Sequence, residues 1–417
     1  MKYTHLFIII FFCSSLSGII ISFLNNNIVQ LNDQNNQNHI DEEEEKLKKK
    51  IKEREEELKN AEEERKKILE EEIKQLEEER KKKEEEKRKK KEEKERRKKE
   101  ENINNKAKDG KLRIACAYAL DNAYVYPTLV AMTSLAENAG EKTFYDIYVM
   151  IDPSFTKENK NVLKSVETKH PQHCEVIFID MKDKFKNLDT NNKITTPAYY
   201  RLDLHNLLTD VNRVIWMDGD TAVFEDLTEL ITLDMKGNYI MGFLDSIPDA
   251  IERFGINDAT VLCSGVLLLD LDALRKNNIT EKINKFIEEN LGNLHQHDQT
   301  IINVVCQGHT APLPPKYGIW CFVDEKFALK HNERQRYGLK YDKEEFINAY
   351  YHPAILHYVW PKPFWRRQSP VFNNEWWDYA TKSGYYDDIY NNSPKWISNR
   401  LLIEKLYERN HYYYYYY

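Results

Sequence analysis

The chain has 417 residues, enough for one large domain or two ordinary ones, and 41% of them are hydrophobic, which excludes a chain that is disordered throughout. Residues 41–100 hold 25 acidic and 25 basic side chains, so the net charge of −7 arises from 44 acidic and 37 basic residues elsewhere. A mildly acidic globular part lacks the broad positive field that binds phosphate backbones, and we expect no nucleic-acid partner.

An apolar segment, Leu6–Leu24, stands near the start of the sequence. Its 19 residues, at about 1.5 Å of rise each, nearly span a bilayer core of roughly 30 Å. Lys2 precedes it and the next basic residue is Lys46, which favours a cytosolic N-terminus. We expect residues 1–24 to be the signal anchor of a single-pass type II protein of the Golgi or ER membrane. A signal peptide cleaved near residues 15–18 is the alternative, giving a secreted protein, and both place the remainder in the secretory lumen.

Residues 25–105 are expected to form a flexible stretch and then a charged helical stem. Residues 41–100 contain no Pro or Gly, and their Glu and Lys blocks place opposite charges at i,i+4 on a helix. Leu47, Ile51 and Leu58 hint at heptads, but residues 77–100 contain no apolar side chain, so a coiled-coil seam is not sustained. We expect a solvated helix of roughly 90 Å that spaces the next domain from the membrane and could dimerise through its first half. A disordered charged tract is the alternative.

From Lys111 onward, apolar strand-like runs alternate with amphipathic helical stretches, which indicates an α/β fold. Most runs lack period-two alternation, so we expect a largely parallel sheet with helices on both faces. One domain is expected over residues 106–382, followed by a C-terminal extension and low-complexity tail at 383–417. The expected strands lie at 112–118, 144–151, 174–180, 213–217, 238–244 and 263–271, and helices are expected at 127–138 and 157–169.

The six cysteines are scattered and show no CxxC spacing, so neither a structural zinc site nor a disulfide framework is indicated. Most stand in apolar runs, where a buried free thiol is the commoner state. They are Cys13, Cys116, Cys174, Cys263, Cys306 and Cys321.

The triplet Asp218-Gly219-Asp220 follows directly on the apolar run 213–217. In an open α/β sheet, ligands bind beyond the carboxyl ends of the strands. Two carboxylates that flank a glycine there can reach one divalent cation, because glycine lets the backbone turn closely. A D-x-D triplet alone is equally well explained as a solvated turn, but its position after a buried strand favours a metal site.

Two further polar clusters carry side chains suited to phosphate and metal chemistry. His357 stands five residues before Lys362 in a segment rich in aromatic residues and proline. An imidazole suits manganese better than magnesium, and an ammonium group would neutralise a diphosphate. The segment Gln296–Thr300 opens an amphipathic helix, and taken alone it is best explained as a helix cap and a solvated first turn.

In combination and in order, these elements resemble glycosyltransferase family 8, and bacterial lipopolysaccharide galactosyl- and glucosyltransferases in particular. The resemblance spans about Lys111 to Lys382. The segment Ala119–Pro127 matches the family's opening strand, Asp, Tyr and Pro, and Thr195–Leu202 matches its Thr-Thr-x-x-Tyr-x-Arg-Leu pattern. The resemblance implies a GT-A, Rossmann-like fold with a mostly parallel central sheet, and a retaining enzyme that uses a UDP-sugar donor and Mn²⁺.

The resemblance also implies three groups of site residues. Those expected to bind the nucleotide, its diphosphate and the adjoining ion are Ala119, Asp121, Asn122, Arg201, Asp218, Gly219 and Lys362. The expected Mn²⁺ ligands are Asp218, Asp220 and His357. The catalytic group expected to lie against the donor sugar comprises Gln299, Asp298 and Asp245.

The implied reaction moves a hexose, glucose or galactose, from the UDP-sugar to a hydroxyl of a glycan or glycoconjugate. Gln299 carries an amide, which is a poor nucleophile, so we expect the acceptor hydroxyl to attack on the face of the leaving phosphate. The sequence departs from the family at Cys263, at Trp360, at Thr300 and in the His357–Lys362 spacing. A catalytically weak nucleotide-sugar-binding protein and a membrane-tethered spacer protein are the alternative functions.

Overall fold

The computed structural model describes residues 37–102, 110–188, 190, 195–294, 296–322, 324–333, 340–359, 363 and 371–393. They belong to two compact units, which divide between Glu92 and Glu93. The apolar segment 6–24 and Lys362 lie outside the described residues. Of the helices described, none combines the length and the apolar character needed to cross a membrane.

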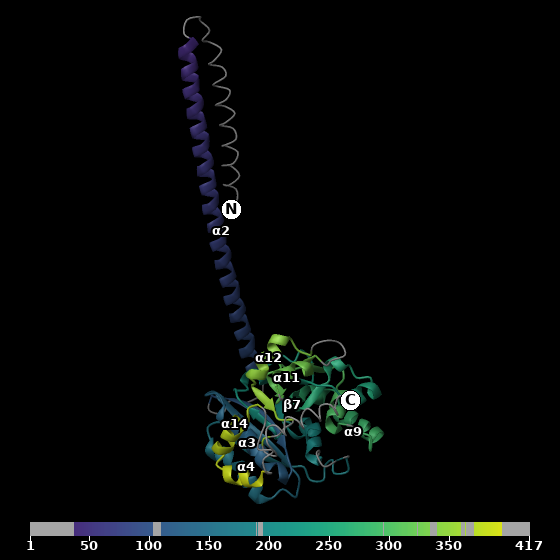
Figure 1. Cartoon of the computed structure of the whole chain (residues 1–417). Coiled ribbons are helices and arrows are strands. Elements are labelled where there is room, and N and C mark those ends of the chain that lie inside the picture. Colours follow the sequence, from purple (N-terminus) through teal and green to yellow (C-terminus); the bar gives the residue numbers. More distant parts are fainter. Residues whose placement is uncertain are drawn as a thin grey trace. The chain divides into compact units, whose positions relative to one another are not determined.

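The described residues of the first unit all belong to one uninterrupted helix, α2 (Gln37–Asn102), which covers the helix expected over 41–100 (Figure 1). The apolar side chains whose exposure is described stand in solvent, with Leu47 51% and Leu76 64% exposed. Ion pairs between successive turns, such as Lys48–Glu44 at 3.0 Å, support an isolated helix by a few tenths of a kcal/mol each. Pairing of this helix as a coiled coil stays a prediction.

The second unit is an α/β fold around a seven-stranded sheet of order β3-β2-β1-β4-β7-β6-β8. Each apolar run expected from the sequence forms one of these strands, and only the short edge strand β8 was not expected. The strands are β1 (Leu112–Ala119), β2 (Thr143–Ile151), β3 (Cys174–Asp180), β4 (Arg213–Met217), β6 (Ile240–Leu244), β7 (Leu262–Asp270) and β8 (Thr310–Pro312).

The sheet is mostly parallel, as predicted, but β7 runs antiparallel to both of its neighbours, β4 and β6. Nearly all successive residues of β7 are buried, and because they point to alternate faces, both faces of the sheet are covered there. The antiparallel direction places Gly265 beside the end of β4, where the Asp218 N–H donates to the Gly265 carbonyl at 2.8 Å.

A smaller sheet brings two distant segments together. It has the order β5-β10-β9, formed by β5 (Thr221–Val223), β10 (Ile355–His357) and β9 (Tyr317–Trp320). β5 begins immediately after the Asp218–Asp220 triplet, and β10 ends at His357. His357 is paired with Thr221 in the antiparallel register, and Thr221 directly follows Asp220. His357 therefore lies beside the Asp218–Asp220 triplet.

Helices surround the central sheet. Both expected helices are present, as α3 (Val125–Glu137) and α4 (Lys157–Lys169), and they lie side by side; α14 (Asn373–Lys382) also packs on α3 (Figure 1). The others are α5 (Leu204–Leu207), α6 (Thr228–Ile231), α7 (Pro248–Phe254), α8 (Leu271–Lys276), α9 (Ile279–Asn290), α10 (His297–Val305), α11 (Glu325–Asn332), α12 (Lys343–Tyr351) and α15 (Tyr386–Asn392), with the 3₁₀ turns η1 (Asn122–Tyr124), η2 (Thr196–Asp203) and η3 (Asp258–Thr260).

The fold continues past residue 382. Helix α15 contributes Ile389, which is fully buried in the main core, so the first part of the expected C-terminal extension is packed structure. The tail from residue 394 lies outside the described residues. The five cysteines described are buried free thiols, as their apolar surroundings predicted.

Candidate active site

The three side chains expected to bind a metal lie together at the carboxyl end of β4. Asp218, Asp220 and His357 each offer one ligand atom, and these atoms all lie within 4.8 Å of one another. His357 Nε2 is 3.3 Å from Asp220 Oδ1 and 3.8 Å from Asp218 Oδ2. Asp220 and His357 are buried, whereas the Asp218 side chain is 28% exposed, so the cluster opens to solvent on the Asp218 side.

The His357 ring is held by β7. Its Nδ1 lies 3.9 Å from the Cys263 sulfur, which leaves Nε2 facing the two carboxylates. The ring rests on the backbone of Gly265, where an added Cβ atom would come within 2.0 Å of Cε1. Burial by itself would lower the pKa of His357, but the neighbouring charge of Asp220 outweighs it and raises the pKa to about 10.

Asp218 is oriented by two donors. Its Oδ1 accepts hydrogen bonds from Arg201 Nη2 at 2.9 Å and from Trp216 Nε1 at 3.0 Å, so Oδ2 is the oxygen that faces His357.

The turn between the two aspartates requires glycine, because a Cβ atom at Gly219 would lie 2.2 Å from Thr128 Oγ1 on α3.

Arg201 serves two carboxylates at once. It is paired with Asp218, and its Nε lies 3.2 Å from Asp298 Oδ2. The Nε hydrogen is donated to the Ala198 carbonyl at 2.9 Å, so the attraction to Asp298 is one of charge. Nη1 donates to the Ser264 carbonyl, and the side chain is 4% exposed. The expected contact of Arg201 with a diphosphate stays a prediction.

The three residues expected at the donor sugar form one network with β7. The Gln299 amide is held at both ends, because Oε1 accepts from the Ser264 N–H at 3.1 Å and Nε2 donates to Asp245 Oδ2 at 2.9 Å. Asp298 precedes Gln299 on the first turn of α10. Burial raises the pKa of Asp245 and of Asp298.

The residues expected at the nucleotide lie at the same edge of the sheet. Ala119 ends β1, and continuing the β1–β4 register from Ala117↔Trp216 places it level with Asp218. Asp121 begins η1 and accepts a hydrogen bond from the Ala123 N–H at 2.9 Å. Its other oxygen accepts from Thr195 Oγ1 at 3.0 Å. Contact of this edge with a uridine stays a prediction.

Asn122 makes three hydrogen bonds within the protein. Its Nδ2 donates to the Ser154 carbonyl at 3.1 Å, and its Oδ1 accepts from the Thr156 N–H at 3.1 Å and from Asn159 Nδ2 at 2.7 Å. Asn122 therefore ties η1 to the loop between β2 and α4. Its expected contact with the nucleotide is not tested by these contacts.

Sequence reasoning assigned no role to Trp216, to Thr128 or to the backbone of Ser264, although each touches a site residue. A tryptophan in a buried strand carries no signal that its indole N–H serves a neighbouring carboxylate. Backbone contacts such as that of Ser264 leave no trace in residue types. These positions could be found only from the structure.

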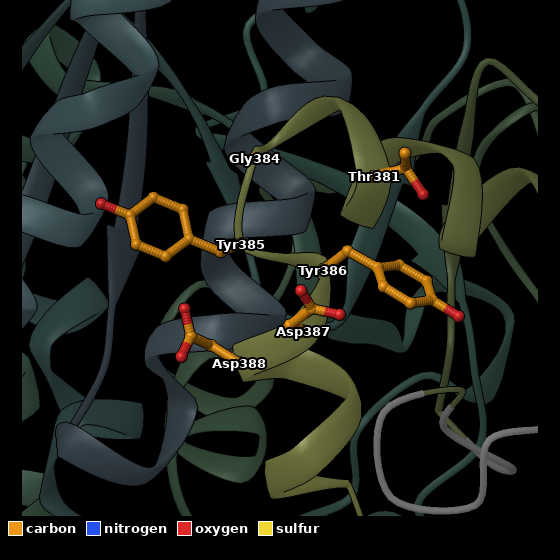
Figure 2. Close-up of a pocket in the computed structure, with 6 residues that line it drawn as sticks. All are labelled: Thr381, Gly384, Tyr385, Tyr386, Asp387 and Asp388. Carbon is orange, nitrogen blue, oxygen red and sulfur yellow. The ribbon is translucent and has the colours of Figure 1, made fainter.

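A pocket of about 420 Å³ lies elsewhere, on the C-terminal helices (Figure 2). Its carboxylates and phenol rings project from α15 and from the turn before it. It is lined by Thr381, Gly384, Tyr385, Tyr386, Asp387 and Asp388, none of which is an expected site residue. The candidate active site is therefore the cluster at the end of β4.

Comparisons with known proteins show the family and the fold of the chain. Residues 115–369 match Glycosyl transferase family 8. General stress protein A of Bacillus subtilis is 24% identical over 275 residues, 64% of this chain and 92% of that protein. A lipopolysaccharide 1,2-glucosyltransferase of Escherichia coli is 23% identical over 291 residues, 67% of this chain and 78% of that protein.

The fold is likewise that of a known structure. Galactosyltransferase LgtC, crystallised with donor and acceptor sugar analogues, superposes with a TM-score of 0.54 at 20% identity, covering 64% of this chain and 96% of that one. This likeness confirms the GT-A-like α/β fold with a mostly parallel central sheet. The family match extends over more than half of the sequence, so this chain belongs to glycosyltransferase family 8.

Proposed function

We propose that this glycosyltransferase moves a hexose, glucose or galactose, from a UDP-sugar to a hydroxyl of a glycan or glycoconjugate, with retention and with Mn²⁺ bound. The convergence of Asp218, Asp220 and His357 is the observation that carries the proposal. Relatives named as a 1,2-glucosyltransferase and as a galactosyltransferase support a hexose donor. Membership of a transferase family favours this activity over that of a binding-only protein.

The donor set fits a manganese ion. Two carboxylate oxygens and one imidazole nitrogen converge, and the nitrogen favours manganese over magnesium. Trp216 and Arg201 orient Asp218, while Cys263 lies against the far side of the His357 ring, as outer-shell partners of metal ligands do. When bound, the ion would stabilise the negative charge that develops on the departing diphosphate.

The sugar side of the site supports attack on the face of the leaving group. Breaking the sugar–phosphate bond builds positive charge at the anomeric carbon. Asp298 is paired with Arg201, and Asp245 accepts a hydrogen bond from Gln299. Each of these two carboxylates therefore already has a partner within the protein, and the third member of the group, Gln299, carries a neutral amide. This arrangement favours stabilising a charged transition state over forming a covalent glycosyl-enzyme.

The proposal is tested by supplying a panel of UDP-sugars to the purified full chain in detergent, with mixed glycan acceptors, and measuring the UDP released. We expect release from one UDP-hexose with Mn²⁺, none with EDTA, and loss of release in Asp220→Asn. A protein that binds UDP but turns over no UDP-hexose with Mn²⁺ would contradict the proposal.

We also propose that residues 6–24 anchor the chain in the ER or Golgi membrane, with α2 as a spacer and the catalytic unit in the lumen. The apolar length and the charge asymmetry around it support the anchor, and the unbroken α2 supports the spacer. In cells, the catalytic unit should be protected from added protease and should stay in the membrane pellet at alkaline pH. Digestion of the catalytic unit in intact vesicles would rule out the lumenal location.

A further inference from the structure

The chain enters α10 through two successive non-glycine residues in the left-handed region, Gln296 at φ 59° and His297 at φ 50°. Seven non-glycine residues have a positive φ in the part of the chain that the structure describes, and no other two of them are consecutive. A side chain makes this conformation unfavourable, because Cβ crowds the backbone. Strain is therefore stored directly before Asp298 and Gln299.

One buried side-chain pair holds this turn. His297 Nδ1 lies 2.9 Å from the Tyr199 hydroxyl, and the two rings meet edge to face with centroids 6.1 Å apart. Tyr199 is 0% and His297 9% exposed. Breaking a hydrogen bond between buried polar atoms is costly, because water cannot replace the lost partner. The pair is thus a firm tie between η2 and the turn.

Each residue of this pair is connected to Asp298, one of the residues expected at the donor sugar. His297 directly precedes Asp298, and η2 also carries Arg201, which pairs with Asp298. On the far side, Asn303 fastens α10 to β7, with hydrogen bonds of 2.8 Å to both the N–H and the carbonyl of Leu262. The first turn of α10 is therefore anchored in front by the Tyr199–His297 pair and behind by Asn303.

We propose that Tyr199 and His297 are positioning residues. Their hydrogen bond, the Tyr199–His297 clamp, holds the strained turn and thereby sets where Asp298 and Gln299 stand against the donor sugar. Of the metal ligands, Asp220 directly precedes β5 and His357 ends β10, elements that the clamp does not join, whereas Asp218 is linked to η2 through its ion pair with Arg201. The inference rests on the proposed function. It states that the clamp affects the rate of sugar transfer, kcat, and not the binding of the donor.

Tyr199→Phe keeps the ring and removes the hydroxyl. We expect kcat to fall by about tenfold, the scale of a small misplacement at a reaction centre, with KM for the UDP-sugar within about twofold of wild type. Tyr145→Phe is the matched control, because Tyr145 is also 0% exposed and its hydroxyl binds Asp226 and the Leu227 N–H away from the site. A wild-type kcat in Tyr199→Phe overturns the proposal, as does an equal loss of kcat in the control.

Gln296→Gly distinguishes a positioning role of Tyr199 from a simple loss of packing around its ring. Glycine adopts the left-handed conformation without penalty, so Gln296→Gly relieves the strain that the clamp opposes. We expect Tyr199→Phe to lower kcat by only about twofold when Gln296→Gly is already present. A loss of the same size in both backgrounds overturns the proposal.

Hydrogen–deuterium exchange on the full chain tests the clamp without any substrate. Tyr199→Phe should speed exchange in residues 296–303 and leave residues 213–223 unchanged, because the lost hydrogen bond joins η2 to the turn and involves no residue of 213–223. Unchanged exchange in residues 296–303 overturns the proposal. If the wild-type chain turns over no UDP-sugar, the proposed function fails, and the exchange experiment still decides whether the clamp exists.

Discussion

His357 Nε2 and Asp220 Oδ1 lie 3.3 Å apart, although the two residues are far apart in the sequence. The pairing of β10 with β5 makes this contact, since His357 ends one strand and Asp220 immediately precedes the other. The site therefore depends on backbone geometry as much as on ligand identity.

Gly265→Ala should weaken metal binding although it replaces none of the three proposed ligands. The new Cβ would lie 2.0 Å from His357 Cε1, so the ring must leave its position beside Asp220. We expect Mn²⁺ affinity to fall by about 10- to 100-fold, measured by isothermal titration calorimetry. Gly140→Ala is the control, because its nearest neighbour is the Asp226 side chain at 3.1 Å, outside the site. Wild-type affinity in Gly265→Ala would show that the ring does not depend on this contact.

Gly219→Ala should lower transfer activity by at least about tenfold, because its Cβ would lie 2.2 Å from Thr128 Oγ1 and the turn between the two aspartates must shift. Thr128 Oγ1 has no hydrogen-bond partner among the residues described, so its removal breaks no such bond there. Adding Thr128→Ala should therefore restore much of the activity, measured as UDP release. An unimproved double variant would mean that the clash is not the cause.

Trp216→Phe should weaken metal binding through Asp218. The substitution removes the indole N–H that donates to Asp218 Oδ1 at 3.0 Å, and outer-shell contacts of this kind are worth about tenfold or more in metal affinity. Trp376→Phe is a matched control, since Trp376 is 1% exposed and lies on α14. Equal Mn²⁺ affinities for the two variants would argue against the role of Trp216.

Asp226→Asn should destabilise the fold in a pH-dependent manner. Burial opposes ionisation, but hydrogen bonds from Thr228, Gly140 and Thr143 outweigh it and lower the pKa of Asp226. A lowered pKa means that the stabilisation is present at neutral pH and is lost as the pH falls below about 4. We expect a loss of about 2 kcal/mol at pH 7, measured by urea unfolding, that shrinks in acid. A loss that is independent of pH would contradict this account.

Much of the fold could be predicted from the sequence, because buried strands and amphipathic helices leave periodic patterns. β1, β4 and α4 appear where those patterns predicted them. The direction of β7 could not be predicted, since a fully buried strand has the same apolar composition whether it runs parallel or antiparallel to its neighbours. Helix α15 was missed because its aromatic and acidic residues show no helical period, and a single buried residue, Ile389, ties it to the core.

Some of the site residues could likewise be predicted from the sequence, and others could not. The Asp218–Asp220 triplet could be proposed from its place after a strand, whereas adding His357 required the family resemblance, because no local pattern links β10 to β5. The left-handed turn at Gln296 and His297 could not be predicted from the sequence, since glutamine does not favour that conformation and a single histidine does not mark it.

The central claim is that Asp218, Asp220 and His357 hold the manganese ion that the transfer requires. The most direct measurement is the Mn²⁺ bound per chain in the presence of UDP, followed by electron paramagnetic resonance in the wild-type protein and in Asp220→Asn and His357→Ala. The account predicts one bound ion in the wild type and affinity lowered by about 100-fold in each variant. Full Mn²⁺ binding in either variant would contradict the account.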